Sequence, residues 1–155
     1  MYKRQAGERA KAEGVTNGLC LNQEAWNTAL VDRCEGYFSG LGGALNMIDV
    51  SNDVQQIETR TAAALSADPS IDGILAAGPH VCAAANKAIK DVGADVHLAC
   101  FDMSDDVTAM LRSGDASFTI DQQQRLQGYM PIIVLHLYNT NAGMLPGANL
   151  SLIHI

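Results

Sequence analysis

Short apolar runs alternate along this chain with longer segments in which apolar residues recur three or four positions apart. Apolar runs of about four to eight residues, bounded by Gly, Pro or Asp, are typical of buried strands, and the longer spacing is typical of helices that cover a sheet. The pattern predicts five strands, at residues 18–21, 45–50, 71–76, 96–101 and 116–121.

Helices are expected between these strands. The first would place Trp26, Leu30 and Cys34 on one side, and the last would be interrupted or kinked near Pro131, which has no backbone N–H. The predicted helices span residues 24–40, 54–67, 79–92, 104–113 and 123–138, and residues 6–13 resemble the end of another. The alternation predicts an α/β fold: a doubly wound, mainly parallel five-stranded sheet with helices on both faces.

Composition and charge narrow the classes of function. A chain of 155 residues suits one domain, and 48% hydrophobic with 17% charged residues indicates an ordered globule. The net charge of −7 and the lack of a Lys/Arg cluster disfavour a nucleic-acid partner. No apolar run approaches the roughly 20 residues of a membrane-spanning helix, and residues 1–9 are too polar for the core of an export signal.

The four cysteines are widely spaced, without the CxxC or Cys/His spacing of a metal site, so no metal is expected. Two interpretations stay open for them: four small buried thiols, or one or more disulfides. In an oxidising compartment the favoured pair is Cys20 with Cys34, because a strand residue and a residue of the following helix can come close.

Candidate chemistry follows from the strand ends, because ligands of parallel α/β sheets bind beyond the carboxyl ends of the strands. The residues there are amides, carboxylates and one aromatic, without a dinucleotide, phosphate-loop or hydrolase motif. Amides and carboxylates match neighbouring hydroxyl groups, and an aromatic face packs against the C–H face of a sugar. This edge therefore predicts a site for a polyol.

An enzyme would need a nucleophile or an acid/base pair. His80, His97 and His136 are scattered, and Asp102 and Asp121, a candidate carboxylate pair, are equally suited to capping helices or accepting from hydroxyls. We therefore expect no catalysis and no cofactor.

Several short motifs occur in the order seen in sugar-binding proteins of ABC importers. They are RCEGY at residues 33–37, DPSIDGI at 68–74, CFD at 100–102, RSG at 112–114, TIDQQ at 119–123 and QGY at 127–129. Over about residues 6–147, the chain resembles the second half of a periplasmic sugar-binding protein of the ribose/galactose type, which has the type I periplasmic binding protein fold.

The resemblance implies roles for individual residues. Arg33 would donate to sugar oxygens, Asp102 after Phe101 would accept from two hydroxyls, and Gln122 would complete the site at a hinge crossing. Without the resemblance, the simpler interpretation of Arg33 is a surface charge paired with Asp32 or Glu35, and that of Asp102 is a helix cap.

The chain also departs from the ribose-binding pattern, which leaves the sugar open. It has Gly78 and Pro79 where those proteins have an asparagine, and residues 51–53, Ser-Asn-Asp, where they stack an aromatic. Asn22, Gln23 and Asn52 are expected to supply polar contacts instead.

The resemblance further implies an organisation and partners. Residues 6–122 would form the second sugar-binding lobe, and residues 123–149 a hinge-crossing helix and turn that joins a first lobe. The apolar face of that helix would then be poorly covered. The partners would be a monosaccharide or polyol and the membrane permease of the transporter, in the periplasm or lipid-anchored outside the cell. The alternatives are the effector-binding core of a LacI-like transcription regulator and a small sugar-modifying enzyme.

The two ends of the chain can be one DNA sequence read from opposite strands. If residues 1–5 are encoded as GTG TAT AAG AGA CAG, the reverse complement translates as Leu-Ser-Leu-Ile-His, which is the sequence of residues 150–154. That DNA resembles a transposon-end adapter used in library preparation. We therefore expect residues 1–5 and 150–155 to derive from an adapter.

Overall fold

The computed structural model describes residues 2–141 and divides the chain into two compact units, Met1–Asp121 (unit 1) and Gln122–Ile155 (unit 2). Unit 1 contains the sheet and the first five helices, and unit 2 contains one further helix. Residues 142–155 lie outside the described part, and with them the predicted turn and the suspected adapter residues at the end of the chain.

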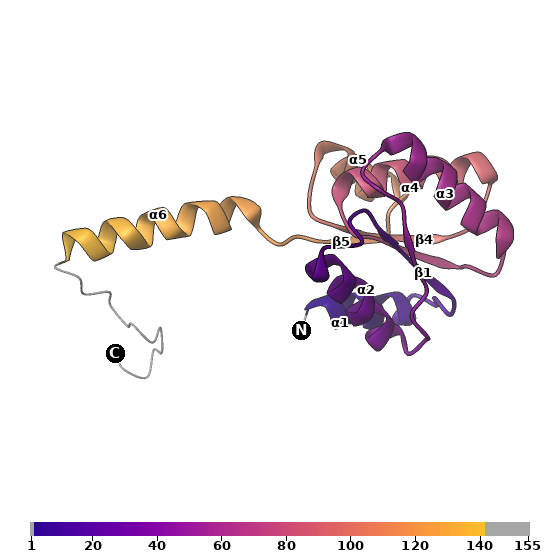
Figure 1. Cartoon of the computed structure of the whole chain (residues 1–155), viewed down its shortest axis with the longest axis horizontal. Helices are drawn as coiled ribbons and strands as arrows, with labels where there is room; N and C mark the ends of the chain where they lie inside the picture. The colour runs from indigo at the N-terminus through magenta and orange to yellow at the C-terminus, as the bar shows by residue number, and fades with distance from the viewer. Residues whose placement is uncertain (1, 142–155) are drawn as a thin grey trace. The chain divides into compact units, whose positions relative to one another are not determined.

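The sheet of unit 1 is entirely parallel, as the alternating pattern predicts (Figure 1). Its strand order is β2-β1-β3-β4-β5, so that the chain runs outward from β1 in both directions. The strands are β1 (Gly18–Asn22), β2 (Met47–Asp49), β3 (Gly73–Ala76), β4 (His97–Phe101) and β5 (Phe118–Ile120). Because every pair is parallel, the carboxyl ends of all five strands lie at one edge of the sheet.

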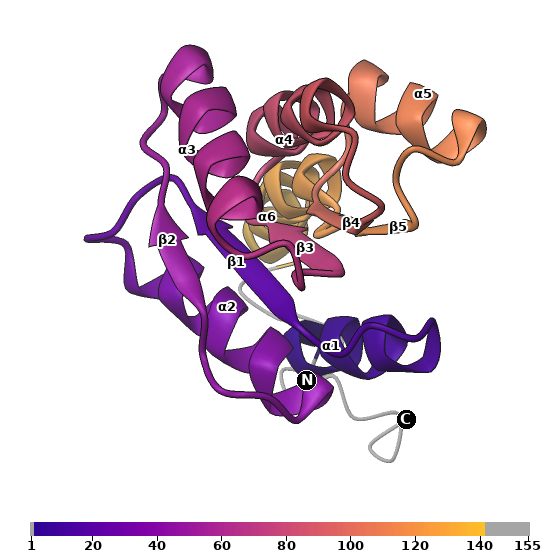
Figure 2. The same ribbon diagram turned by 90° about the vertical axis from the view of Figure 1, so that its right-hand side faces the viewer.

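Helices cover both faces of this sheet (Figure 2). One layer holds α1 (Tyr2–Ala12) and α2 (Thr28–Leu41), and the other holds α3 (Val54–Ala67), α4 (Pro79–Val92) and α5 (Asp105–Ser113). Strand side chains alternate between the two cores: Leu98 and Cys100 face α3, α4 and α5, whereas Ala99 and Phe101 face α1 and α2. The predicted α/β fold is therefore confirmed.

The first helix after β1 is shorter than predicted. It begins at Thr28 because the side chain of Asn27 accepts a hydrogen bond from the Ala29 amide at 3.1 Å and caps the helix there. Trp26 consequently lies in the preceding loop, where it is 81% exposed, and not on the buried side of the helix.

Two further helices differ from expectation at specific residues. α1 begins at Tyr2, so residues 2–5 continue the helix that the sequence predicts over 6–13. In unit 2, α6 (Gln124–Thr140) runs without interruption through Pro131. Proline removes only one backbone donor, and the rest of the helix continues on either side of it.

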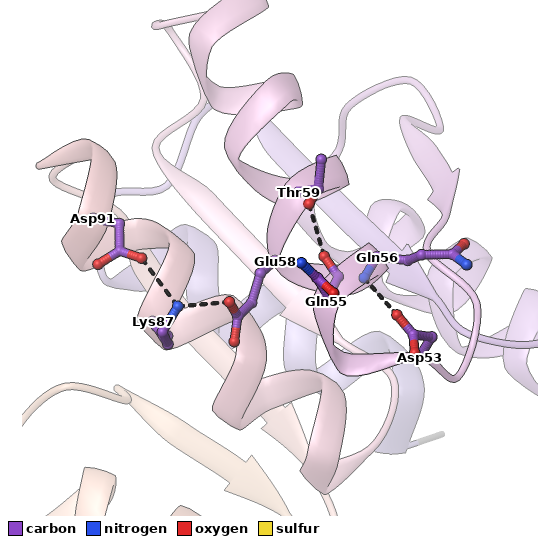
Figure 3. A network of polar contacts seen from close by, with 7 residues as sticks. All are labelled: Asp53, Gln55, Gln56, Glu58, Thr59, Lys87 and Asp91. Atoms are coloured by element: carbon purple, nitrogen blue, oxygen red, sulfur yellow. Dashed lines mark hydrogen bonds and ion pairs between the residues drawn. The ribbon is translucent and has the colours of Figure 1, made fainter.

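Polar contacts fasten α3 and α4 on the exterior of unit 1 (Figure 3). The Asp53 carboxylate accepts from the Gln56 amide at 2.9 Å and caps α3. The Lys87 ammonium of α4 donates to Glu58 of α3 at 2.6 Å and to Asp91 at 3.2 Å. These contacts are exposed, so each contributes little on its own.

All four cysteines are paired in unit 1, which favours the disulfide interpretation over four buried thiols. Cys20 of β1 is joined to Cys34 of α2, the pair that the sequence favours, with the Cα atoms 5.6 Å apart. Cys82 of α4 is joined to Cys100 of β4, with the Cα atoms 5.7 Å apart. Each disulfide thus ties one helix to the sheet, and the two lie on opposite faces.

The apolar side chains of α6 are exposed within unit 2, and poor cover of this face in the complete protein stays a prediction. Ile132 is 66% exposed and Leu135 is 61% exposed, and α6 has no buried residue. Within residues 2–141, no helix combines the length and the apolar character needed to cross a membrane.

Candidate ligand-binding site

The candidate site lies at the edge of unit 1 where the parallel strands end. Phe101 is the last residue of β4, Asp102 follows it, and Arg33 lies in the second turn of α2. Many residues of the sequence separate Arg33 from Phe101 and Asp102, and β3 lies between β1 and β4 in the sheet. Only the folded structure brings the three residues together.

The guanidinium group of Arg33 contacts Ala77, Phe101 and Asp102. Its Nη1 donates to the carbonyl oxygen of Ala77 at 2.6 Å, and its Cζ lies 4.6 Å from the centroid of the Phe101 ring. The same nitrogen lies 4.0 Å from Oδ2 of Asp102. With 13% of its side chain exposed, Arg33 is not the surface charge of the simpler interpretation, and Asp32 pairs with Lys3 instead.

Phe101 is completely buried, and it lies beneath the Arg33 guanidinium. A cation over an aromatic face is stabilised by the ring quadrupole, and more strongly where water is excluded. In unit 1 the ring therefore orients the arginine. A direct contact between this ring and a sugar stays a prediction.

The backbone at Asp102 has an uncommon conformation that orients its carboxylate. Its φ angle is +68°, in the left-handed region, and its amide donates to the Ile120 carbonyl at 2.8 Å. Its own carbonyl accepts from the Thr119 hydroxyl at 2.9 Å. Such backbone conformations destabilise the folded state by about 1 kcal/mol each and are concentrated at functional sites. Ser104, and not Asp102, caps α5, so the helix-cap interpretation of Asp102 is wrong.

Asn22 and Asn52 occupy different environments at the same edge. Asn22 is 1% exposed, and its Oδ1 accepts from the Glu24 amide at 2.9 Å, which shapes the loop after β1. Asn52 is exposed. Its Oδ1 lies 3.1 Å from Nε2 of His80, and its Nδ2 donates to Oε1 of Glu24 at 3.5 Å. These contacts join the loops that follow β1 and β2 with the first turn of α4. Contacts of either asparagine with a ligand stay predictions.

Two predicted contributors remain. Gln122 begins unit 2, where its carbonyl accepts from the Gln127 side chain at 2.7 Å, and its part in the site stays a prediction. Gln23 is half-buried beside Gly78, and its Oε1 is buried without a hydrogen-bond donor from the protein. An acceptor of this kind can be satisfied by water or by a ligand hydroxyl.

The cluster combines hydrogen-bond donors with acceptors. Arg33 supplies donors, Asp102 supplies acceptors, and the two charges lie close enough to offset each other. Among residues 2–141, no cluster of His, Cys, Asp or Glu has the composition of a metal site. The Ala77 carbonyl was missed by sequence reasoning, because a backbone oxygen has no motif.

The family comparison matches most of the chain. Residues 3–141 match the model of the periplasmic binding protein domain. A crystal structure of a carbohydrate transporter from Acidothermus cellulolyticus 11B, in complex with myo-inositol, is 34% identical, with a TM-score of 0.87 over 95% of this chain and 51% of that one. A comparison with curated proteins gives no match.

Two other structures support the fold. An ABC transporter periplasmic solute binding protein from Actinobacillus succinogenes 130z, with bound D-allose, is 21% identical, with a TM-score of 0.81 over 93% of this chain and 54% of that one. A periplasmic sugar binding protein from Legionella pneumophila is 20% identical, with a TM-score of 0.81 over 88% of this chain and 54% of that one. The chain therefore spans about half the length of each of these proteins. On the family match and the 34% identity, the chain belongs to the periplasmic binding protein domain family.

Proposed function

We propose that this chain is the second lobe of the substrate-binding subunit of a sugar ABC transporter, and that Arg33 and Asp102 bind a neutral monosaccharide or polyol. The observation that supports this most strongly is the Arg33, Phe101 and Asp102 cluster: a donor group held over a buried ring, beside an acceptor group at the carboxyl edge of the sheet.

The chemistry of the cluster favours a neutral ligand rich in hydroxyls. A guanidinium group offers several N–H donors in a plane, and a carboxylate can accept from two adjacent hydroxyls. The two charges sum to zero, so an anionic ligand would face the Asp102 carboxylate without a second cation from this cluster. The 34% identical transporter was crystallised with myo-inositol, which makes a cyclic polyol the first ligand to test.

The mechanism in the complete protein is closure of two lobes over the ligand. In this proposal residues 6–122 belong to one lobe, Gln122 lies at the hinge, and α6 belongs to the other lobe. A ligand that contacts both lobes stabilises only the closed form, since it has no such contacts in the open form. The closed form is then recognised by the membrane permease, outside the cytoplasmic membrane.

The site binds its ligand without converting it. The Asp102 carboxylate supplies hydrogen-bond acceptors and the Arg33 guanidinium beside it supplies donors, which is what neighbouring hydroxyl groups of a ligand need. The ligand should be released unchanged.

A thermal-shift screen of the full-length protein tests this proposal. The panel contains myo-inositol, D-allose, D-ribose and D-galactose, with glucose 6-phosphate and glucuronate as anionic controls. Saturation at about 100 times the Kd stabilises a protein by about 2.7 kcal/mol, which raises its Tm by several degrees. A neutral polyol should give this shift and be recovered unchanged by NMR. A shift from the anions alone, or turnover of the ligand, would contradict the proposal.

A further inference from the structure

We infer that the disulfide between Cys20 and Cys34 positions Arg33 for ligand binding, so that its removal weakens binding through Arg33 and not only through loss of stability. This inference rests on the proposed function and deepens it. Cys20 and Cys34 are positioning residues, because they act on the ligand through the neighbouring arginine.

The disulfide fixes the part of α2 that contains Arg33. Cys34 is the next residue after Arg33 and is fully buried. Cys20 lies in the middle of β1, which is hydrogen-bonded to β2 on one side and to β3 on the other. The covalent link therefore anchors one turn of the helix to an interior strand of the sheet.

Two partners of Arg33 lie at the ends of strands and not on α2, which makes these contacts sensitive to any movement of the helix. Ala77 follows β3, and Phe101 ends β4. A displacement of the helix by about 1 Å would lengthen the 2.6 Å hydrogen bond to the Ala77 carbonyl beyond useful range. It would also move the guanidinium off the Phe101 ring.

The second disulfide provides a control of similar span. Cys82 and Cys100 are separated by 18 residues, against 14 for Cys20 and Cys34. Their sulfur atoms lie in the core on the opposite face of the sheet from α2. Removing that pair imposes the general effect of losing a disulfide and leaves α2 linked to β1. Phe101, the residue after Cys100, stays in place because β4 is paired with β3 on one side and with β5 on the other.

Calorimetric titration of the full-length protein with myo-inositol separates the two effects. The Cys20→Ala/Cys34→Ala variant should bind about tenfold more weakly than the parent, as expected for a lost charge-assisted hydrogen bond. In an Arg33→Lys background, which keeps a cation and a measurable affinity, the same change should cost less than about twofold. The Cys82→Ala/Cys100→Ala variant should show no such dependence on residue 33. The inference would be overturned if removal of Cys20 and Cys34 weakened binding equally in the parent and in the Arg33→Lys background. It would also be overturned if both disulfides showed the same dependence on residue 33.

A measurement without ligand keeps the inference separate from the proposed function. The Phe101 ring current should give the Nε–H signal of Arg33 a distinct chemical shift in a 1H–15N spectrum, assigned by its loss in Arg33→Lys. Removal of Cys20 and Cys34 should move this signal toward the value of an unstructured arginine, and removal of Cys82 and Cys100 should not. An unchanged signal would overturn the inference. A parent protein that binds no polyol would contradict the proposed function alone.

Discussion

The guanidinium carbon of Arg33 lies 4.6 Å from the centroid of the buried Phe101 ring. This relationship places a permanent cation at the carboxyl edge of the sheet, where a flexible side chain would otherwise extend into water. Under the proposed function, the buried ring contributes to ligand binding indirectly, because it reduces the conformations that Arg33 must lose when a ligand binds.

Replacement of Phe101 with leucine should therefore weaken ligand binding. Leu retains an apolar group in the core but removes the aromatic face, which contributes about 0.5–2 kcal/mol to a nearby cation, or about 2- to 30-fold in affinity. Titration of myo-inositol into the full-length Phe101→Leu protein measures the effect. Phe38→Leu is the matched control, because Phe38 is also buried but packs edge-on against Tyr37. Equal losses of affinity in the two variants would argue against a role for the ring.

Alanine at Gly40 should destabilise unit 1, although alanine is the better helix former by about 1 kcal/mol. A Cβ atom there would overlap the Arg4 carbonyl oxygen and lie 2.7 Å from the Glu8 nitrogen, so α1 and α2 would have to separate. Overpacking of this kind costs about 1–3 kcal/mol. Urea unfolding measures the loss, with Ser39→Ala, at the exposed neighbouring position, as the control. A stabilised Gly40→Ala protein would show that the helix contact is looser than described.

Stability should fall in acid partly because of Asp72. Burial raises the pKa of this carboxyl group, but hydrogen bonds from the Thr16 hydroxyl and from the amides of Asn17 and Thr16 outweigh it and hold the pKa below its usual value. The unfolded chain therefore binds the proton more readily. The contribution of Asp72 is complete above the unfolded pKa of about 3.9 and is lost as the pH falls through the lower folded value.

Asp72→Asn tests this sign. At pH 7 the variant should be less stable by about 1 kcal/mol, a figure kept low because the group is partly solvated. Toward pH 3 the difference from the parent should shrink, since the parent loses the same interaction. Urea unfolding at both pH values measures it, and a difference that is constant with pH would contradict the assigned cause.

The exposed apolar residues of α6 should make the isolated chain self-associate. Ile132 and Leu135 are each more than half exposed, and exposed apolar groups on one helix promote association. The double variant Ile132→Gln/Leu135→Gln should bind less hydrophobic dye and elute later in gel filtration. His136→Gln, a polar replacement on the same helix, should change neither. If the double variant binds as much dye and elutes at the same volume as the parent, these residues of α6 do not cause self-association.

Much of the fold could be predicted because it depends on local patterns. Each strand is a short apolar run, and the alternation with helices fixes a parallel sheet with few possible arrangements. The start of α2 could not be predicted, because Glu24, Ala25 and Trp26 favour a helix as well as a loop. Asn27 decides the matter by capping the helix, and that depends on the loop that Asn22 shapes.

The candidate site could be predicted only in part. Motifs in the expected order pointed to Arg33 and Asp102, which the fold brings within 4.0 Å of each other. The contact with the Ala77 carbonyl and the position of the ring beneath the guanidinium depend on α2 meeting the ends of β3 and β4 at one edge of the sheet. Such contacts between distant segments leave no periodic signal in the sequence.

The most direct test of the account is titration of the full-length protein with the best ligand from the thermal-shift screen. Asp102→Asn keeps the shape of the side chain and removes its charge, and Arg33→Ala removes the donor. Asp53→Asn makes the same chemical change at the same edge of the sheet, and asparagine caps α3 as well as aspartate does.

The account predicts one bound polyol per protein and an affinity about 100-fold lower in Asp102→Asn and in Arg33→Ala, since each loses charge-assisted hydrogen bonds to the ligand. Asp53→Asn should bind like the parent. Unchanged affinity in both Asp102→Asn and Arg33→Ala would contradict the central claim.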